Sequence, residues 1–153
     1  FLLMTTALFA GSFDPFTIGH ADIVTRGLSL FDSVVIAIGV NDKKQPLYTS
    51  EERLRQISSF YAEERRIKVI AYTGLTADIA KEVGATVLLR GIRSGLDYEY
   101  ERSLADINRC LTGIETVFLF TAQHLSHVSS GAIRELINYG HDVSGMLPPG
   151  FVL

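Results

Sequence analysis

The sequence predicts a single α/β domain built on a doubly wound, parallel sheet of five strands. Five short apolar runs are spaced along the chain, and stretches with helical periodicity separate them. Strands that alternate with helices favour a parallel sheet with right-handed crossover connections. No repeat, low-complexity tract or Pro/Gly-rich linker divides the 153 residues. Residues 1–153 are therefore interpreted as one domain.

The predicted strands are the runs 6–10, 33–38, 67–71, 86–89 and 116–120. They are expected to be buried, because they are apolar on both faces and rich in β-branched residues. In an open parallel sheet, ligands bind beyond the carboxyl ends of the strands, near the point where strand order reverses. The segments expected to carry function therefore follow Ala10, Val40, Ala71, Leu89 and Phe120.

The predicted helices are the stretches 18–30, 51–63, 77–83, 98–111 and 130–139. Thr49 and Glu52 have the spacing of a capping box at the start of the second helix. Gly84 and Gly113 follow the third and fourth helices, where a left-handed glycine commonly ends a helix. Ser129 and Ser130 are natural N-caps for the last helix.

The composition is that of an ordinary globular domain, and it excludes several classes of function. The net charge is −3 with scattered Lys and Arg, so no nucleic-acid partner is expected. No run approaches the roughly 18 apolar residues of a membrane span, so no membrane partner is expected. Cys110 is the one cysteine, which excludes an internal disulfide and predicts a reducing, cytoplasmic location. Its position in a helical pattern predicts a packed, unreactive side chain.

Two expectations concern the ends of the chain. Residues 1–3 are interpreted as leader or vector residues before a start at Met4, because no basic region precedes this short apolar run. The chain stops at Leu153, and a final short helix is expected to be truncated.

Several segments after predicted strands carry groups that suit anions. Residues 11–20 combine glycines and an Asp-Pro turn with His20, which lies on the first turn of a helix. Helix starts attract anions, and a histidine there can donate a hydrogen bond to a phosphoryl oxygen. Arg90 and Arg93 flank a glycine, an arrangement that suits forked recognition of phosphate oxygens. Residues 125–134 open the last helix with small residues that can cradle an anion.

These features together indicate phosphoryl or nucleotidyl transfer. Lys43 and Lys44 add positive charge near the same rim, although each feature alone is also typical of capping or of a solvated surface. No general base stands out, and in phosphoryl transfer positioning and charge stabilisation supply most of the catalysis. The sequence contains neither a Walker A loop nor a dinucleotide fingerprint nor a Gly-x-Ser-x-Gly elbow.

Two of these segments, GSFDPFTIGH at 11–20 and VSSGAIR at 128–134, resemble the signatures of the nucleotidylyltransferase superfamily. More closely, the chain resembles the bacterial phosphopantetheine adenylyltransferases from about Ala7 to Pro148. The segments that also match this family are 42–46, 49–53, 89–93 and 97–101. The resemblance implies a Rossmann-like nucleotidyltransferase fold and a reaction of ATP with 4′-phosphopantetheine. The products would be dephospho-coenzyme A and pyrophosphate, in the penultimate step of coenzyme A biosynthesis. It also implies Mg²⁺ bound mainly through the ATP phosphates, with no metal ligand in the protein, and a homohexamer.

The same resemblance assigns roles to individual residues. His20 would be catalytic and would steady the α-phosphate, while Ser12 would contact both substrates. The residues that hold phosphopantetheine would be Ser12, Lys44, Thr76 and Arg90. The ATP site would comprise Ser12, Phe13, His20, Gly91, Ile92, Arg93, Glu101, Leu125, Ser126, His127, Val128, Ser129, Ser130 and Gly131.

Some positions depart from the family pattern, and two other functions stay open. Ile18, Leu125 and Gly131 replace residues that are common in the family, and family members vary at Thr76. One alternative is a sister transferase that adenylates nicotinamide mononucleotide or uses CTP on a polyol phosphate. The other is a non-catalytic nucleotide-sensing module on the same scaffold. The presence together of His20, Lys44, Arg90, Arg93 and Glu101 argues against the latter, although a fold never establishes a function.

Overall fold

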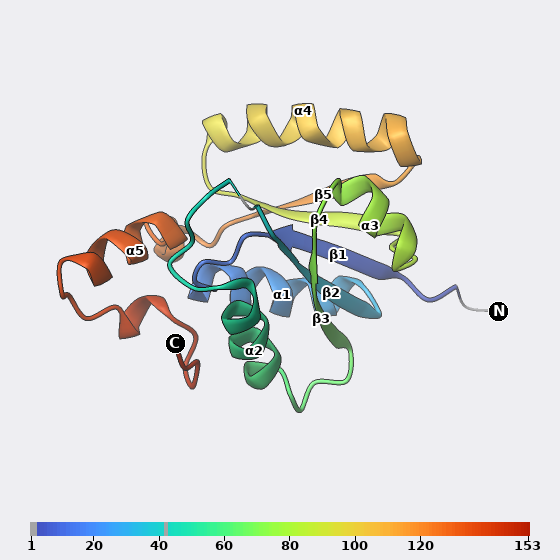
Figure 1. The fold of residues 1–153 in the computed structure, drawn as a ribbon. Helices are drawn as coiled ribbons and strands as arrows, with labels where there is room; N and C mark the ends of the chain where they lie inside the picture. The colour runs from blue at the N-terminus through green and yellow to red at the C-terminus, as the bar shows by residue number, and fades with distance from the viewer. Residues whose placement is uncertain (1–2, 42) are drawn as a thin grey trace.

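The computed structural model describes residues 3–41 and 43–153, which form a five-stranded parallel sheet with helices on both faces (Figure 1). Its strands are β1 (Thr6–Gly11), β2 (Ser33–Gly39), β3 (Ile67–Tyr72), β4 (Val87–Ile92) and β5 (Glu115–Phe120). Its helices are α1 (Ile18–Leu30), α2 (Ser50–Phe60), α3 (Thr76–Glu82), α4 (Gly95–Thr112) and α5 (Ser130–Asn138). The order β3-β2-β1-β4-β5 confirms the doubly wound α/β fold. Phe1 and Leu2 of the predicted leader lie outside the described residues.

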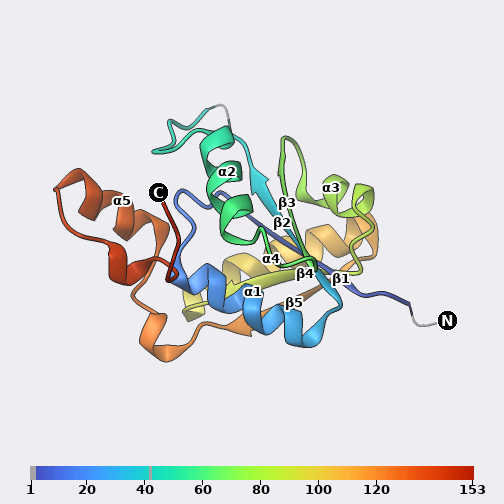
Figure 2. The same ribbon diagram turned by 90° about the horizontal axis from the view of Figure 1, so that it is seen from below.

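Alternate residues of the central strands serve two separate cores. Phe9 and Ile36 belong to the larger core, which α1, α2 and α5 cover. Leu8 and Val35 belong to the smaller core, under α3. Figure 2 shows α1 and α2 on one face of the sheet, and Figure 1 shows α4 on the other. This period of two follows from the strand geometry, in which successive side chains point to opposite faces.

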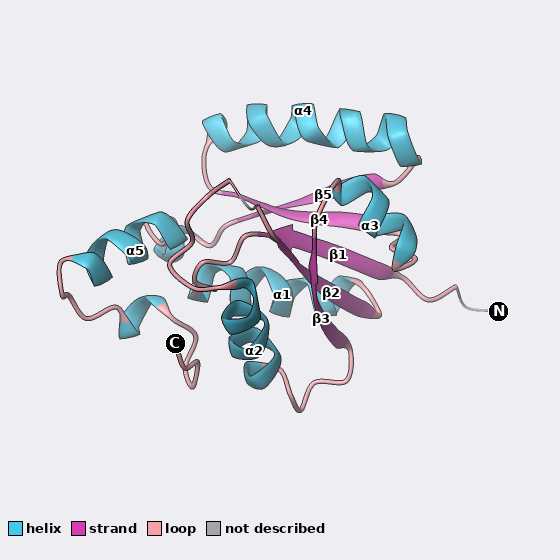
Figure 3. Ribbon diagram, in the orientation of Figure 1, coloured by secondary structure: helices cyan, strands magenta, loops and turns pink. Residues whose placement is uncertain are grey.

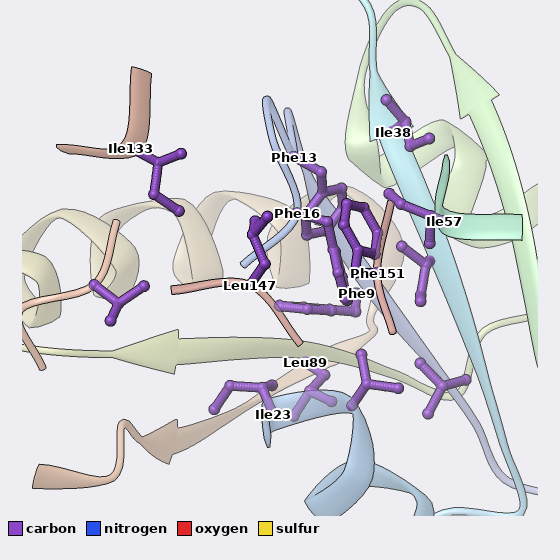
Figure 4. Close-up of a cluster of buried hydrophobic side chains, with 14 of the residues drawn as sticks. Phe9, Phe13, Phe16, Ile23, Ile38, Ile57, Leu89, Ile133, Leu147 and Phe151 are labelled. Atoms are coloured by element: carbon purple, nitrogen blue, oxygen red, sulfur yellow. The ribbon is translucent and has the colours of Figure 1, made fainter. Parts of the chain in front are cut away.

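The larger core extends past the sheet into the segment that follows β1. Phe13 and Phe16 pack there with Phe9, and Phe151 from the end of the chain joins them (Figure 4). Ring centroids of Phe9 and Phe13 are 5.2 Å apart in an edge-to-face arrangement, which is favourable for aromatic pairs. The polar segment 11–20 is therefore anchored by its own aromatic side chains.

Strands β1 and β4 separate before either of them ends. β1 stays paired with β2 up to Gly11, which lies opposite Ile38. Its pairing with β4 ends earlier, at Phe9 opposite Leu89, while β4 continues beside β5 up to Ile92. A crevice therefore opens at the point where strand order reverses. In Figure 3 the arrow of β1 points to this end of the sheet, the side that carries α5.

The structure corrects several predicted boundaries. Arg90–Ile92 were expected in a loop but continue β4, because their backbone pairs with β5 up to Phe120. Helix α4 begins at Gly95 rather than residue 98, since the Ser94 hydroxyl accepts a hydrogen bond from Asp97 N–H and caps it. Helix α2 ends at Phe60 rather than residue 63, because the chain turns there and Glu64 N–H bonds to Tyr61 O.

Two predictions of burial were wrong. β3 and β5 are edge strands whose side chains are partly exposed, and Phe120 is 77% exposed. Cys110 is exposed on α4 rather than packed, because it lies on the face of that helix turned away from the sheet. The capping box of Thr49 and Glu52 is confirmed. Among the described residues, no helix is both long and apolar enough to span a membrane.

Gly27 allows α1 to approach the sheet closely, which leads to a stability prediction. A Cβ at this position would lie 2.8 Å from Leu89 Cδ2, and Leu89 is fully buried. We expect Gly27→Ala to lower the free energy of unfolding by about 1–3 kcal/mol, as overpacking does. Chemical denaturation would measure this loss. Gly95→Ala is the matched control, because a Cβ there meets no atom within 4 Å, and unchanged stability in Gly27→Ala would contradict the expectation.

Candidate active site

Two cavities in the described part of the chain meet at the crevice between β1 and β4. The smaller, which we call the histidine cavity, has a volume of about 350 Å³ and contains His20. The larger, the lysine cavity, has a volume of about 720 Å³ and is lined by Lys43 and Lys44. Both cavities share the same wall, formed by Ala10, Gly11, Ser12, Arg90 and Glu101. Two ligands bound side by side would therefore meet at this wall.

Arg90 occupies the gap that β1 leaves beside β4. Its guanidinium donates two hydrogen bonds to Glu101, at 2.8 Å from Nε to Oε2 and 2.6 Å from Nη2 to Oε1. A third hydrogen bond goes from Nη1 to Ala10 O, on the strand that has moved away. Although burial opposes the charged form, Glu101 raises the pKa of Arg90 above its ordinary value. Arg90 is thus a fixed cation at the wall between the cavities.

His20 lies in the histidine cavity with its proton directed by the backbone. Its Nδ1 accepts a hydrogen bond of 3.0 Å from Thr17 N–H, which completes a capping box at the start of α1. The neutral ring therefore carries its proton on Nε2. Burial, together with the positive charges of Arg90 and Arg93, lowers the pKa of His20 to about 3. At neutral pH His20 is an uncharged hydrogen-bond donor.

Aromatic packing holds the His20 ring in place. Its centroid lies 4.9 Å from that of Phe13 and 5.4 Å from that of Phe16. Phe13 in turn packs against the backbone at Gly11, where an added Cβ would lie 3.1 Å from the Phe13 ring. The glycine is therefore needed for close approach of ring and backbone. The donor is pre-organised before any ligand arrives.

The start of α5 closes the histidine cavity on the other side. Ser129 caps the helix, its hydroxyl accepting from Ala132 N–H at 3.1 Å. Ser130, predicted as a cap, is instead the first helical residue, and its hydroxyl donates to Pro15 O at 2.7 Å. Arg134 donates to Asp14 O at 2.8 Å and also lines the cavity. Helix α5 is thereby attached to the segment that carries His20.

Arg93 supplies a further cation at the histidine cavity. Its Nε donates to Asp97 Oδ2 at 3.2 Å, and its backbone N–H donates to the same oxygen. Both side chains are partly exposed and line the cavity. Asp97 therefore orients Arg93 while the remaining guanidinium N–H groups stay available to an anion.

The lysine cavity is lined by a mixture of polar and apolar groups. Thr76, predicted to contact phosphopantetheine, lies there beside Tyr72, with 2.8 Å between the two hydroxyl oxygens. Tyr100 and Asn108 of α4 also line this cavity. Arg90 and the two lysines give this cavity three cationic side chains, so an anionic group is expected to bind in it.

Most of the predicted site residues are brought together. The histidine cavity contains Ser12, Phe13, His20, Gly91, Arg93, Glu101, Val128, Ser129, Ser130 and Gly131, and the lysine cavity contains Ser12, Lys44, Thr76 and Arg90. Four predicted residues line neither cavity. Ile92 and Leu125 are buried, Ser126 bonds to Gln123 O, and His127 is exposed.

Several residues of the site were missed by the sequence reasoning. Arg134 and Asp97 lie in or next to the segments that the sequence had already indicated as anion sites. Their charged side chains could therefore have been predicted to belong to the site. Tyr72, Tyr100 and Asn108 gave no such signal, because a polar residue on an amphipathic helix or at a strand end looks like ordinary surface. Only the packing of α4 over the sheet places the last two at a cavity.

The chain is similar to known proteins along most of its length. Residues 8–136 match the cytidylyltransferase-like family. A phosphopantetheine adenylyltransferase of Porphyromonas gingivalis is 60% identical over 147 residues, which cover 96% of each chain. A phosphopantetheine adenylyltransferase of Bacteroides fragilis is 50% identical over 147 residues, which cover 96% of this chain and 98% of the relative.

Solved structures that are more distant in sequence share the fold. A bifunctional NMN adenylyltransferase/ADP ribose pyrophosphatase from Francisella tularensis superposes with a TM-score of 0.73 at 13% identity, over 95% of this chain and 45% of that one. A lipopolysaccharide core biosynthesis protein from Thermoplasma volcanium gives 0.57 at 21% identity, over 78% and 98%. These similarities concern the fold alone. The sequence identities of 50–60% to the two phosphopantetheine adenylyltransferases, over nearly the whole chain, establish the family. The chain belongs to the phosphopantetheine adenylyltransferase family.

Proposed function

We propose that this protein transfers the adenylyl group of ATP to the phosphate of 4′-phosphopantetheine, giving dephospho-coenzyme A and pyrophosphate. The observation that carries the proposal is the shared wall of Ser12, Arg90 and Glu101 between two cavities. A transfer between two anionic substrates needs two neighbouring sites with cations at their junction. The names of the relatives that share 50–60% of this sequence supply the identity of the acceptor.

In the proposed arrangement ATP occupies the histidine cavity and phosphopantetheine the lysine cavity. An oxygen of the acceptor phosphate attacks the α-phosphorus, forming one P–O bond while the bond to pyrophosphate breaks. The acceptor phosphate is largely a dianion near neutral pH, since the second pKa of a phosphate monoester is about 6, so it needs no general base. His20 Nε2–H donates to an α-phosphate oxygen, and Arg90 reduces the repulsion between the two anions.

We also propose that Mg²⁺ enters the site with ATP, where it would neutralise phosphate charge. Among residues 3–41 and 43–153, no three His, Cys, Asp or Glu side chains are grouped to hold a metal ion. The two acidic side chains that line the histidine cavity, Asp97 and Glu101, accept hydrogen bonds from Arg93 and Arg90 respectively. The residues present thus fit an ion held by the nucleotide rather than by the protein.

Assembly and location are proposed as a homohexamer in the cytoplasm. Exposed apolar side chains on α4, among them Leu96, Ile107 and Leu111, support burial against further copies of the chain. The single free cysteine supports a reducing compartment. Light scattering after size-exclusion chromatography would measure the assembly, and a monomer at micromolar concentration would contradict it.

A pyrophosphate-release assay with a panel of acceptors tests the proposed reaction. The panel contains 4′-phosphopantetheine and nicotinamide mononucleotide with ATP, and a polyol phosphate with CTP. Turnover with phosphopantetheine is expected. Turnover with nicotinamide mononucleotide alone would favour a sister transferase, and tight ATP binding without turnover on any acceptor would favour a nucleotide-sensing module.

Lys44→Ala should separate the two proposed sites. We expect the KM for phosphopantetheine to rise by about tenfold or more, the size of one lost charge-assisted hydrogen bond, while the KM for ATP stays unchanged. Steady-state kinetics with each substrate varied in turn would measure both constants. Lys81→Ala is the matched control, since Lys81 is exposed on α3 and lines neither substrate cavity. Equal rises in both KM values would contradict the assignment of the lysine cavity to the acceptor.

A further inference from the structure

Arg53 is a buried arginine beneath the junction of the two cavities, and it lines neither of them. It lies in the first turn of α2 and is only 3% exposed. Within the described residues it forms no ion pair with a carboxylate. All four of its hydrogen bonds go to backbone carbonyls. A cation taken out of water without a counter-ion is costly, so its partners are expected to matter.

The four carbonyls belong to three separate segments. Nη1 donates to Ser12 O at 2.5 Å and, more weakly, to Gly39 O at 3.5 Å. Nε donates to Tyr48 O at 3.1 Å and to Thr49 O at 3.4 Å. The guanidinium therefore ties the segment after β1 to the end of β2 and to the start of α2. The stretch between the last two carries Lys43 and Lys44 of the lysine cavity.

The bond to Ser12 O has a consequence on the opposite side of the same peptide unit. The Ser12–Phe13 peptide is trans, so Phe13 N–H points away from Ser12 O and hence away from Arg53. In the described part of the chain, Phe13 N–H has no protein acceptor. Phe13 itself lines the histidine cavity. A charged donor on the carbonyl also polarises the peptide and strengthens the N–H as a donor.

The backbone at Phe13 is held in an unusual conformation that needs such support. Its φ is +48°, in the left-handed region that non-glycine residues rarely adopt. Arg53 holds the carbonyl before this residue. After it, the Asp14 carboxylate accepts from Leu47 N–H at 2.8 Å and from Tyr48 N–H at 2.9 Å. Conformations of this kind persist where the surroundings over-determine them.

We propose that Arg53 is a positioning residue for the transfer reaction: through Ser12 O it directs and polarises Phe13 N–H toward the phosphate that reacts. This inference rests on the proposed function, because the phosphate it invokes is that of the bound nucleotide. Arg53 itself contacts neither substrate. Its effect is expected on the chemical step, since an N–H aimed at the reacting phosphate stabilises the charge that develops there.

Arg53→Lys and Arg53→Ala test the inference. Lysine keeps the charge but offers a single point donor in place of the fork, and kcat should fall by about tenfold; alanine should lower it by about 10- to 100-fold. Methylguanidinium added to Arg53→Ala should restore part of kcat. The matched control is Arg55→Ala, which removes an exposed cation from the same helix outside both substrate cavities.

The outcomes separate this inference from a structural role and from the proposed function. Wild-type protein that shows no turnover with ATP and phosphopantetheine would contradict the proposed function. Active wild type combined with Arg53 variants that lose thermal stability but keep the native kcat would overturn the positioning role. So would methylguanidinium that raises the Tm of Arg53→Ala without raising its kcat.

A measurement on the wild-type protein keeps the inference testable even where the variants do not fold. In a nitrogen–proton correlation spectrum, ATP added without acceptor should move the Phe13 amide proton downfield, as expected for a new charge-assisted hydrogen bond. An unmoved Phe13 amide under saturating ATP would overturn the inference. In Arg53→Lys, where folded, the same shift should be smaller than in wild type.

Discussion

His20→Ala should lower kcat by about 10²- to 10³-fold, the usual effect of removing one donor from a transition-state anion site. The reason lies in the tautomer: Thr17 N–H donates to Nδ1, so the single N–H of the neutral ring is at Nε2, and His20 lines the histidine cavity. Alanine offers no donor there. Binding of ATP should persist, because Arg93 and the start of α5 are untouched. Single-turnover kinetics and calorimetric titration with ATP would measure the two effects separately.

His141→Ala is the control, because His141 is exposed and lines neither substrate cavity. The His20 variant also loses a helix-capping contact and aromatic packing, so its Tm is expected to fall somewhat. Turnover must therefore be compared at a temperature where both proteins are folded. Near-native kcat under those conditions would rule out the proposed role of His20.

The pH profile of the same variant gives a second readout. A pKa of about 3 keeps the imidazole of the free enzyme neutral, so the ratio of wild-type to His20→Ala kcat/KM for ATP should stay constant from about pH 5.5 to 8. A ratio that falls with a midpoint near 6.5 would contradict a buried, neutral donor. Stability should behave differently: below about pH 6.5 the unfolded chain binds a proton that the folded chain does not, so wild type loses stability as the pH falls.

Glu101→Ala is expected to have a comparably large effect through Arg90. Glu101 is 8% exposed, and its carboxylate accepts two short hydrogen bonds from the guanidinium. Breaking a buried ion pair costs 3–5 kcal/mol, and the lower end, about 3 kcal/mol, is expected because the Arg90 side chain is 32% exposed. Because Arg90 lines both cavities, the kcat/KM for each substrate should fall by about a hundredfold or more. Thermal denaturation and steady-state kinetics would measure the two losses.

The Arg109–Glu115 pair offers a matched comparison for Glu101→Ala. Its closest N···O distance is 3.4 Å and both side chains are more than half exposed. Glu115→Ala should change stability by less than about 0.5 kcal/mol, as surface ion pairs do, and should leave turnover unchanged. Similar stability losses in the two variants would contradict the expectation that the Arg90–Glu101 pair stabilises the fold more than an exposed ion pair does.

Much of the fold and part of the site were predictable from the sequence because local patterns determine them. The period of the apolar residues and the Thr49 capping box locate α2 without reference to the rest of the chain. The extension of β4 through Arg90 was not predictable in this way. The extension depends on pairing with β5, and this pairing is set by the assembled sheet rather than by the local sequence. From the sequence alone, a charged residue after an apolar strand indicates the start of a loop.

Side chains that act through the backbone were the hardest to predict. Arg53 occupies the fourth position of a helix start that looks solvated, yet it is buried because carbonyls from three segments converge on it. Tyr72 and Asn108 likewise gain their place from the packing of distant elements. Such residues carry no local signature, since the groups they contact are main-chain atoms that every residue possesses.

The early separation of β1 from β4 also bears on how the chain is held together. Residues up to 72 build one half of the sheet and residues from 87 build the other, and the two halves share a short ladder that ends at Phe9 and Leu89. Beyond that point the Arg90 side chain donates across the gap to Ala10 O. Ligands that fill both cavities would bridge this seam and bind only the folded chain, so by mass action they would stabilise it. Slower amide hydrogen exchange along the facing edges of β1 and β4 would then report that both substrate sites are occupied.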